Sequence, residues 1–216
     1  MKEPQEVHIN PRNSLVVVVD MENEHCKPGG KNYSPYKAQR MPGVISAIGS
    51  FLERARDVSI PVIYVQSVRT LEEPEFTVFG RAPYLEKGTW AVEIVSELEP
   101  DKKDPVVQKF THDPFYNTDL DRLLPGLVPD PTSCYAIITG GGLATCVRHA
   151  VMGFYLRGYW TVVPEDCVYA GNDAEREGAL AHFSQRGYPS IFLSRSDLIK
   201  ISADPAVTGP RPVPGK

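Results

Sequence analysis

Six short apolar runs recur along the chain, and helical patterns or turns fill the stretches between them. The runs lie at 14–19, 61–66, 105–109, 135–139, 160–163 and 190–193. The first run, SLVVVV, is continuously apolar rather than alternating, as is typical of a strand that is covered on both faces of a parallel sheet. We therefore expect a three-layer α/β/α fold, in which helices joined by right-handed crossovers cover both faces of a six-stranded parallel sheet.

The predicted helices lie between these runs. Pro42 opens an amphipathic pattern whose inward face carries Val44, Ile48, Phe51, Leu52 and Ala55. Thr89 is expected to cap a short helix that turns Trp90, Ile94 and Leu98 inward. Further helices are predicted near 118–124, from Cys146 to Gly158, and over 173–186 with Gly187 as the C-terminal cap.

The length of 216 residues suits a single domain with a full hydrophobic core. We expect one domain over 1–216, with residues 1–13 as an N-terminal extension and 201–216 as a tail rich in proline and glycine. Two readings of the tail stay open, a disordered end or an arm that docks on a neighbouring subunit.

Composition limits the classes of partner. With 42% hydrophobic and 23% charged residues the chain has the balance of an ordinary globular protein, and a net charge of −4 gives no support for binding to nucleic acid or to an anionic membrane. The N-terminus has no basic segment followed by an apolar run, and no apolar stretch approaches the length of a membrane span. We therefore expect a cytoplasmic protein that acts on a small molecule.

The four cysteines, at 26, 134, 146 and 167, are widely spaced and form no C-x-x-C pair. This spacing argues against a zinc ribbon, a thioredoxin motif or a disulfide framework. Cys146 follows three glycines and begins a predicted helix, where unpaired N–H groups and the helix dipole favour a thiolate. From this stretch alone, however, a buried structural cysteine is the more frequent outcome.

Two further polar residues come at strand ends in the same way as Cys146. Asp20 follows the first apolar run and Lys109 ends the third. Ligands of open parallel sheets bind beyond the carboxyl ends of the strands, where the strand order reverses, so these three side chains are expected to meet in one pocket. A carboxylate can take the thiol proton, an ammonium can hold the resulting anion, and glycine N–H groups can receive an oxyanion. Taken singly, Asp20 could be a turn cap and Lys109 a solvated surface charge.

Three motifs, VVVVDMEN, VVQK and ITGGGLATCV, occur in this order and spacing. Together they resemble the isochorismatase-like cysteine hydrolases, and the resemblance runs from about Ser14 to Ile199. It implies a catalytic triad of Asp20, Lys109 and Cys146. It also implies a strand order of 3-2-1-4-5-6 and a homo-oligomer, either a tetramer or a dimer.

The resemblance also implies an oxyanion site at the glycine turn. A cis peptide between Gly141 and Gly142 would turn main-chain N–H groups toward the substrate oxygen, with the N–H groups of Gly142 and Cys146 as donors. The chain departs from the family pattern at two places. Glu22 stands where the family commonly has glutamine, and Leu143 stands where it commonly has threonine.

The segment 67–100 contains no histidine, whereas family members that hold a metal carry histidines there. We therefore expect no metal and no cofactor. With Cys146 present, the resemblance favours a cysteine-dependent amidohydrolase that cleaves a C–N bond of a small polar ureide or amide. Such a substrate would be biuret-like, triuret-like or an N-carbamoyl compound. The reaction would release ammonia and pass through a covalent thioester-type intermediate. The alternatives are a hydrolase of a short amic acid such as maleamate, and a non-catalytic binding or scaffold protein.

Substrate contacts are predicted at Glu22, His25, His112 and Gln185. The two histidines follow catalytic strand ends, although solvent-exposed loop histidines would look the same. His149, three residues after the cysteine, would lie over the next helical turn and so point away from the substrate. A carboxylate substrate would require a lysine or arginine in the pocket, and the sequence leaves open which basic side chain that would be.

Overall fold

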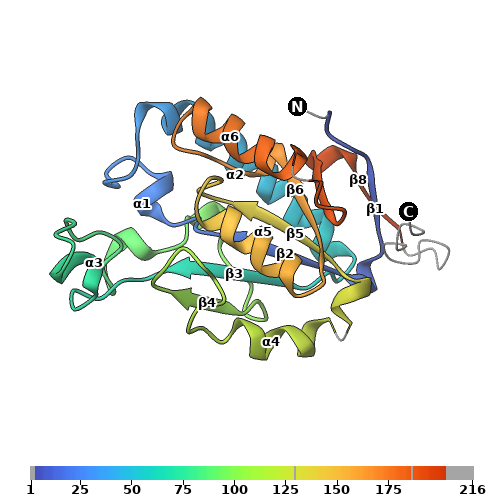
Figure 1. Ribbon diagram of the computed structural model, residues 1–216, viewed down its shortest axis with the longest axis horizontal. Helices are drawn as coiled ribbons and strands as arrows, with labels where there is room; N and C mark the ends of the chain where they lie inside the picture. The colour runs from blue at the N-terminus through green and yellow to red at the C-terminus, as the bar shows by residue number, and fades with distance from the viewer. Residues whose placement is uncertain (1–2, 129, 186, 203–216) are drawn as a thin grey trace.

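The computed structural model describes residues 3–128, 130–185 and 187–202, apart from the side chain of Gln185. Its centre is a six-stranded sheet (Figure 1). The strands are β2 (Ser14–Val19), β3 (Val62–Ser67), β4 (Val106–Lys109), β5 (Tyr135–Gly140), β6 (Trp160–Pro164) and β7 (Ile191–Ser194). Every neighbouring pair is parallel and the order is β4-β3-β2-β5-β6-β7, which confirms the expected fold and strand order.

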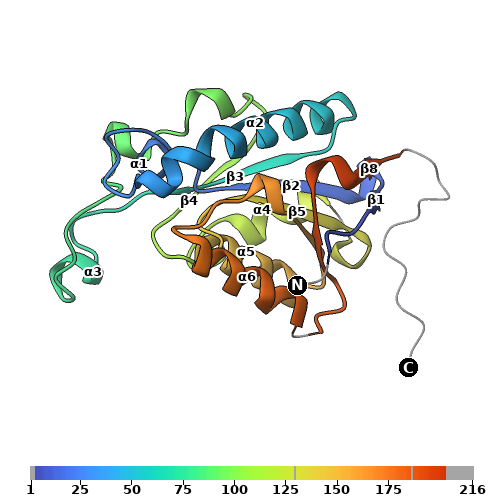
Figure 2. The same cartoon turned by 90° about the horizontal axis from the view of Figure 1, so that it is seen from above.

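Helices cover both faces of this sheet, as the unbroken apolar run of β2 predicted. One face packs against α2 (Pro35–Asp57), and the other packs against α4 (Leu120–Leu127), α5 (Cys146–Leu156) and α6 (Asp173–Gln185) (Figure 2). Strand β2 divides its side chains between the two layers. Val17 and Val19 belong to the core under α5, whereas Val16 and Val18 belong to the core under α2.

Helix α2 begins seven residues before the predicted start, so Pro42 lies inside it rather than opening it. Ser34 supplies the N-terminal cap, because its hydroxyl accepts a hydrogen bond from the N–H of Lys37 at 3.3 Å, and Pro35 occupies the first helical position. Pro42 has no N–H group to donate within the helix, which continues through it because residues on both sides of it pack their apolar face against the sheet. The additional turns bring Lys37 into the helix.

The helix predicted after Thr89 is replaced by two short 3-10 turns, η2 (Trp90–Val92) and η3 (Ser96–Leu98). Backbone bonds to the first loop, from Asn23 N to Glu93 O and from Val95 N to Met21 O, hold the intervening residues extended. The spacing therefore changes, and Trp90 is 47% exposed rather than turned inward. Two other short helices, α1 (Asn23–Cys26) and α3 (Pro74–Thr77), lie in the long segments that follow β2 and β3.

The predicted N-terminal extension is partly ordered within the fold. Strand β1 (Val7–Ile9) pairs in parallel with β8 (Ile199–Ile201) to form a separate two-stranded sheet. Val7 and Ile9 are buried and His8 is exposed, the alternation of a strand that is covered on one face. Residues 203–216 of the predicted tail lie outside the described part of the chain. Within the described part, none of the helices combines the length and apolar character needed to cross a membrane.

Candidate active site

Three polar side chains meet at the carboxyl ends of adjacent strands. Asp20 directly follows β2, Ser67 ends β3 and Lys109 ends β4, and the β3–β4 register pairs Ser67 with Lys109. The Lys109 Nζ atom lies 2.9 Å from Asp20 Oδ2 and 2.6 Å from Ser67 Oγ, and Ser67 Oγ donates to Asp20 Oδ1 at 2.9 Å. The parallel register thus assembles a buried carboxylate, hydroxyl and ammonium from three separate parts of the sequence.

The backbone at Asp20 adopts a left-handed conformation, with φ of 48°. This conformation turns the chain sharply at the end of β2, and aspartate is one of the few side chains that tolerate it. The hydroxyl of Tyr169 donates to the Asp20 carbonyl oxygen at 2.8 Å and so holds the turn. The Asp20 residue is only 1% exposed.

Lys109 is the charge that allows a carboxylate to be buried here. Burial alone would raise the pKa of Asp20, but the positive charge of Lys109 holds it below its usual value. In the same way, burial alone would lower the pKa of Lys109, but the negative charge of Asp20 raises it above its usual value. The ammonium also donates to the Thr111 carbonyl oxygen at 3.1 Å, so the pair is ionised and fully engaged.

Cys146 is the first residue of α5, and its sulfur faces the same cluster. Sγ lies 3.4 Å from Lys109 Nζ and 3.3 Å from His112 Nδ1. Burial raises the pKa of the thiol to about 12, the charge of Asp20 acts in the same direction, and Lys109 opposes both effects. The sequence favoured a thiolate, but the resting thiol is protonated, because burial and the ionised Asp20 outweigh the lysine. The proton must therefore leave as the sulfur attacks.

The glycine turn before Cys146 brings the backbone close to a neighbouring ring. The Gly141–Gly142 peptide bond is cis, at the position that the resemblance implied. A Cβ atom on Gly141 would lie 1.9 Å from the ring of Tyr169, so only glycine fits there. The N–H groups of Gly142 and Cys146 donate to no other group of the described residues. These two donors at the start of α5 are available to a substrate oxygen.

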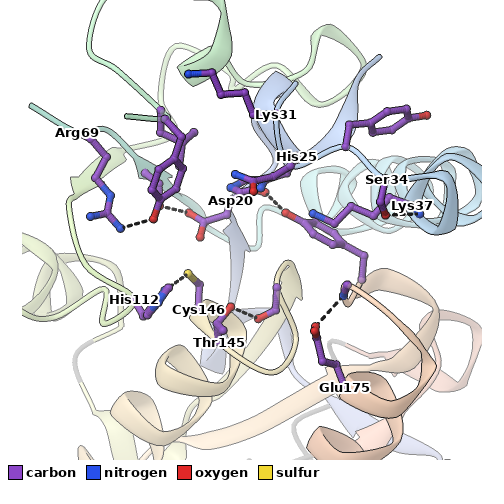
Figure 3. A pocket seen from close by; sticks show the side chains of 18 of the residues that line it. Asp20, His25, Lys31, Ser34, Lys37, Arg69, His112, Thr145, Cys146 and Glu175 are labelled. Atoms are coloured by element: carbon purple, nitrogen blue, oxygen red, sulfur yellow. Dashed lines mark hydrogen bonds between the residues drawn. The ribbon is translucent and has the colours of Figure 1, made fainter. Parts of the chain in front are cut away.

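A cavity of about 490 Å³ opens above the cluster (Figure 3). Asp20, Cys146 and Gly142 line its floor, and the loops that follow β2 and β3 form its walls together with the start of α2. This volume suits a small ligand rather than a polymer. Cys146 is 7% exposed and its sulfur borders the cavity.

Glu22 does not contact the cavity, so the prediction that it binds substrate is wrong. Its backbone bridges to Ile94, which directs the carboxyl group beneath β3, where Oε1 accepts a hydrogen bond from Ser67 N at 2.6 Å. Burial and the nearby charge of Asp20 raise the pKa of Glu22 well above its usual value, which favours the protonated carboxyl group. A neutral carboxylic acid has the shape and hydrogen-bonding groups of the glutamine that the family commonly has here.

Both predicted histidines line the cavity. Burial lowers the pKa of His25 to about 4, so its ring is neutral. Burial and the charge of Lys109 also lower the pKa of His112, whose ring touches the nucleophile. His149 makes no such contact, because its Nδ1 atom lies 2.8 Å from the carbonyl oxygen of Thr145 and the residue is exposed. The side chain of Gln185 is outside the described structure, so its role stays a prediction.

Ser67, Tyr169 and Lys37 are among the cavity residues that the sequence did not reveal. Ser67 was assigned to a loop, although a hydroxyl at the end of an apolar run was a usable signal. Lys37 precedes Met41, Val44 and Ile48 at helical spacing, which indicates a lysine on the buried face of α2. Within residues 3–128, 130–185 and 187–202, no group of three or more histidine, cysteine, aspartate or glutamate side chains is arranged to hold a metal ion.

Two comparisons of the sequence with known proteins point to the same family. The isochorismatase domain model matches residues 14–191. Ureidoacrylate amidohydrolase RutB of Caulobacter segnis is 26% identical over 202 residues, covering 82% of this chain and 81% of that protein.

Solved structures agree with this match. N-carbamoylsarcosine amidase of Thermoplasma acidophilum is 29% identical, with a TM-score of 0.69, and the match covers 86% of this chain and 97% of that one. A cysteine hydrolase of Pseudomonas syringae pv. phaseolicola shares the fold with a TM-score of 0.75 at 22% identity, over 91% of this chain and 94% of that one. The match of the isochorismatase domain model over most of the chain shows that this protein belongs to the isochorismatase-like family.

Proposed function

We propose that the protein is a cysteine-dependent amidohydrolase that cleaves a C–N bond of a small polar amide or ureide and releases ammonia. The observation that carries the proposal is the contact of the Cys146 sulfur, on the floor of a small cavity, with the ammonium of a buried carboxylate–ammonium pair. Two relatives named for such chemistry, ureidoacrylate amidohydrolase and N-carbamoylsarcosine amidase, support it.

The first half of the reaction forms a covalent intermediate. Asp20 accepts the thiol proton of Cys146 as sulfur attacks the carbonyl carbon, and the N–H groups of Gly142 and Cys146 stabilise the oxygen anion that forms. Lys109, 3.4 Å from the sulfur, stabilises its negative charge while the proton moves. Protonated Asp20 then gives its proton to the departing nitrogen, the C–N bond breaks, and ammonia leaves an acyl group on sulfur.

The second half of the reaction regenerates the thiol. A water molecule enters the position that ammonia leaves, Asp20 accepts one of its protons, and the oxygen attacks the thioester carbon. When the C–S bond breaks, the proton returns from Asp20 to Cys146 and the acid product dissociates. One carboxylate thus acts as base and acid in turn, which requires the pKa of Asp20 and that of the thiol to change as charge moves between them.

The decisive experiment measures ammonia release by the purified protein across ureides, N-carbamoyl acids, amic acids and primary amides. Cys146→Ala and Cys146→Ser should each lower turnover by at least about 1,000-fold while thermal unfolding stays cooperative. Cys134→Ala removes a buried thiol outside the cavity and serves as the matched control. Substantial hydrolysis by Cys146→Ala would remove the nucleophile assignment, and the absence of turnover with every compound would remove the reaction class.

A further inference from the structure

The cationic side chains of the cavity differ in whether the protein supplies them with a carboxylate or a hydrogen-bond acceptor. Four of them line its walls, Lys31, Lys37, Arg69 and Arg81, and the catalytic lysine lies beneath the floor, bound to Asp20. Both arginines bind the carboxylate of Glu75, and Lys31 donates to the carbonyl oxygen of Pro83 at 2.5 Å. Among the described residues, the ammonium of Lys37 has neither a carboxylate within 4.0 Å nor a hydrogen-bond acceptor.

Lys37 is nevertheless buried, with 8% of its surface exposed. Its Nζ atom lies 5.0 Å from the centre of the Tyr169 ring, and burial lowers the pKa of the ammonium. Two carboxylates, Glu24 and Glu175, act on it only through space. Glu24 accepts a hydrogen bond from Asn32, and Glu175 accepts bonds from the segment 171–172, so neither is directed at the lysine. The aromatic ring supplies no countercharge, and a buried ammonium without a carboxylate or a hydrogen-bond acceptor is costly unless a ligand supplies the missing anion.

The position of Lys37 favours an anion inside the cavity. It lies in the first turn of the 23-residue helix α2, whose capping residue Ser34 also lines the cavity, so the positive end of the helix dipole adds to the charge of the ammonium. The Tyr169 ring under the ammonium donates its hydroxyl to the Asp20 carbonyl oxygen. One aromatic ring therefore separates the cation from the catalytic floor, and Figure 3 shows Lys37 extending from α2 toward the cavity that holds Asp20 and Cys146.

We propose that Lys37 binds a carboxylate of the substrate while Cys146 attacks its amide or ureide carbonyl. The substrate is then a short molecule with an amide or ureide at one end and a carboxylate at the other, such as an N-carbamoyl amino acid or an amic acid. This inference rests on the proposed amidohydrolase function and makes it more specific. It disfavours uncharged ureides of the biuret type, which offer the ammonium no countercharge.

The test compares substrates that differ only in charge. N-carbamoylglycine and maleamate are each assayed for ammonia release beside their methyl esters, with the wild type and with Lys37→Met, a nearly isosteric change. We expect the acid-to-ester ratio of kcat/KM to fall by about 10- to 100-fold in Lys37→Met, chiefly through KM, because a charge-assisted hydrogen bond is lost. Lys27→Met removes an equal charge that pairs with Glu97 outside the cavity, and it should leave the ratio unchanged.

A binding measurement separates the two proposals. Titration calorimetry with maleate, a short dicarboxylate, should show binding to the wild type that weakens by a similar factor in Lys37→Met but not in Lys27→Met. An unchanged acid-to-ester ratio and unchanged maleate binding in Lys37→Met would overturn the carboxylate site and leave the hydrolase intact. Lysine-dependent maleate binding without ammonia release from any amide would instead overturn the hydrolase and leave the carboxylate site standing.

Discussion

Replacing Lys109 with methionine tests the buried ion pair most directly. The side chains of Lys109 and Asp20 are 0% and 2% exposed, and Lys109→Met would leave the carboxylate with two close donors, the Ser67 hydroxyl at 2.9 Å and the Cys146 thiol. Removing one partner of a buried pair costs about 3–5 kcal/mol if the other stays charged. Asp20 can instead take up a proton, which at pH 7 costs about 4 kcal/mol for a group whose unperturbed pKa is 3.8. Both routes give the same expected loss of stability.

The loss should depend on pH in a defined direction. In the wild type, the lowered pKa of Asp20 contributes stability that is present above pH 3.8 and is lost as the pH falls through the folded-state pKa. In Lys109→Met burial raises that pKa, so the variant loses about 1.4 kcal/mol of unfolding free energy per pH unit as the pH rises above 3.8. The difference between the two proteins should therefore be small near pH 4 and large at pH 7.

Urea unfolding at pH 4 to 7 measures this difference, with Asp20→Asn/Lys109→Met as the partner variant. The double variant has no unpaired charge and should recover at least about 2 kcal/mol relative to the single variant at pH 7. Lys27→Met breaks a surface pair and should cost less than about 1 kcal/mol at every pH. Ammonia release by Lys109→Met should fall at least about 100-fold, because a protonated Asp20 accepts no proton. Equal stability of the single and double variants at pH 7 would refute the reasoning.

Two other changes test neighbouring groups. His112→Asn should lower kcat/KM only about tenfold, because it removes one polar contact with Cys146. Asp20→Asn removes the base and should lower kcat/KM at least about 100-fold. If kinetic assays show the larger loss in His112→Asn, the histidine is the proton acceptor. Glu22→Gln should become more stable than the wild type as the pH rises above 4.5, and the gain in unfolding free energy should be at most about 1.4 kcal/mol per pH unit. The reason is that the raised pKa of Glu22 makes the folded wild type hold a proton that its unfolded chain releases. Denaturation curves from pH 5 to 8 measure this gain, and the same change at the exposed residue Glu53, Glu53→Gln, is the control. A stability difference between Glu22→Gln and the wild type that stays constant with pH would contradict the prediction.

The sheet was predictable because most of its strands are largely apolar runs, and each candidate catalytic residue lies at or just beyond the end of one of them. Asp20, Lys109 and Cys146 needed only the rule that parallel strands end at a common edge. Their contact is present in the structure, whereas their catalytic roles stay a proposal, and the dimer or tetramer that the resemblance implies stays a prediction.

The carboxylate site was hidden by an error in one helix start. Placing the start of α2 at Pro42 left Lys37 in a loop, where a lysine is normally solvated. The protonation of the thiol was also beyond the sequence, because it depends on how deeply Cys146 and Asp20 are buried together. Local sequence patterns therefore identified the candidate catalytic residues. They did not identify the charge states of these residues or the wall of the cavity that α2 forms.

The left-handed backbone at Asp20 limits how this site could be redesigned. A longer carboxylate such as glutamate would carry the same charge but would lack the tolerance for this conformation that short polar side chains have, at a cost of roughly 1–2 kcal/mol. A redesigned site with the base at another position would still need the turn at Asp20 and the hydrogen bond from Tyr169 that stabilises it. Engineering of this scaffold is therefore easier on the α2 wall, whose regular helical backbone accepts many side chains, than on the catalytic floor.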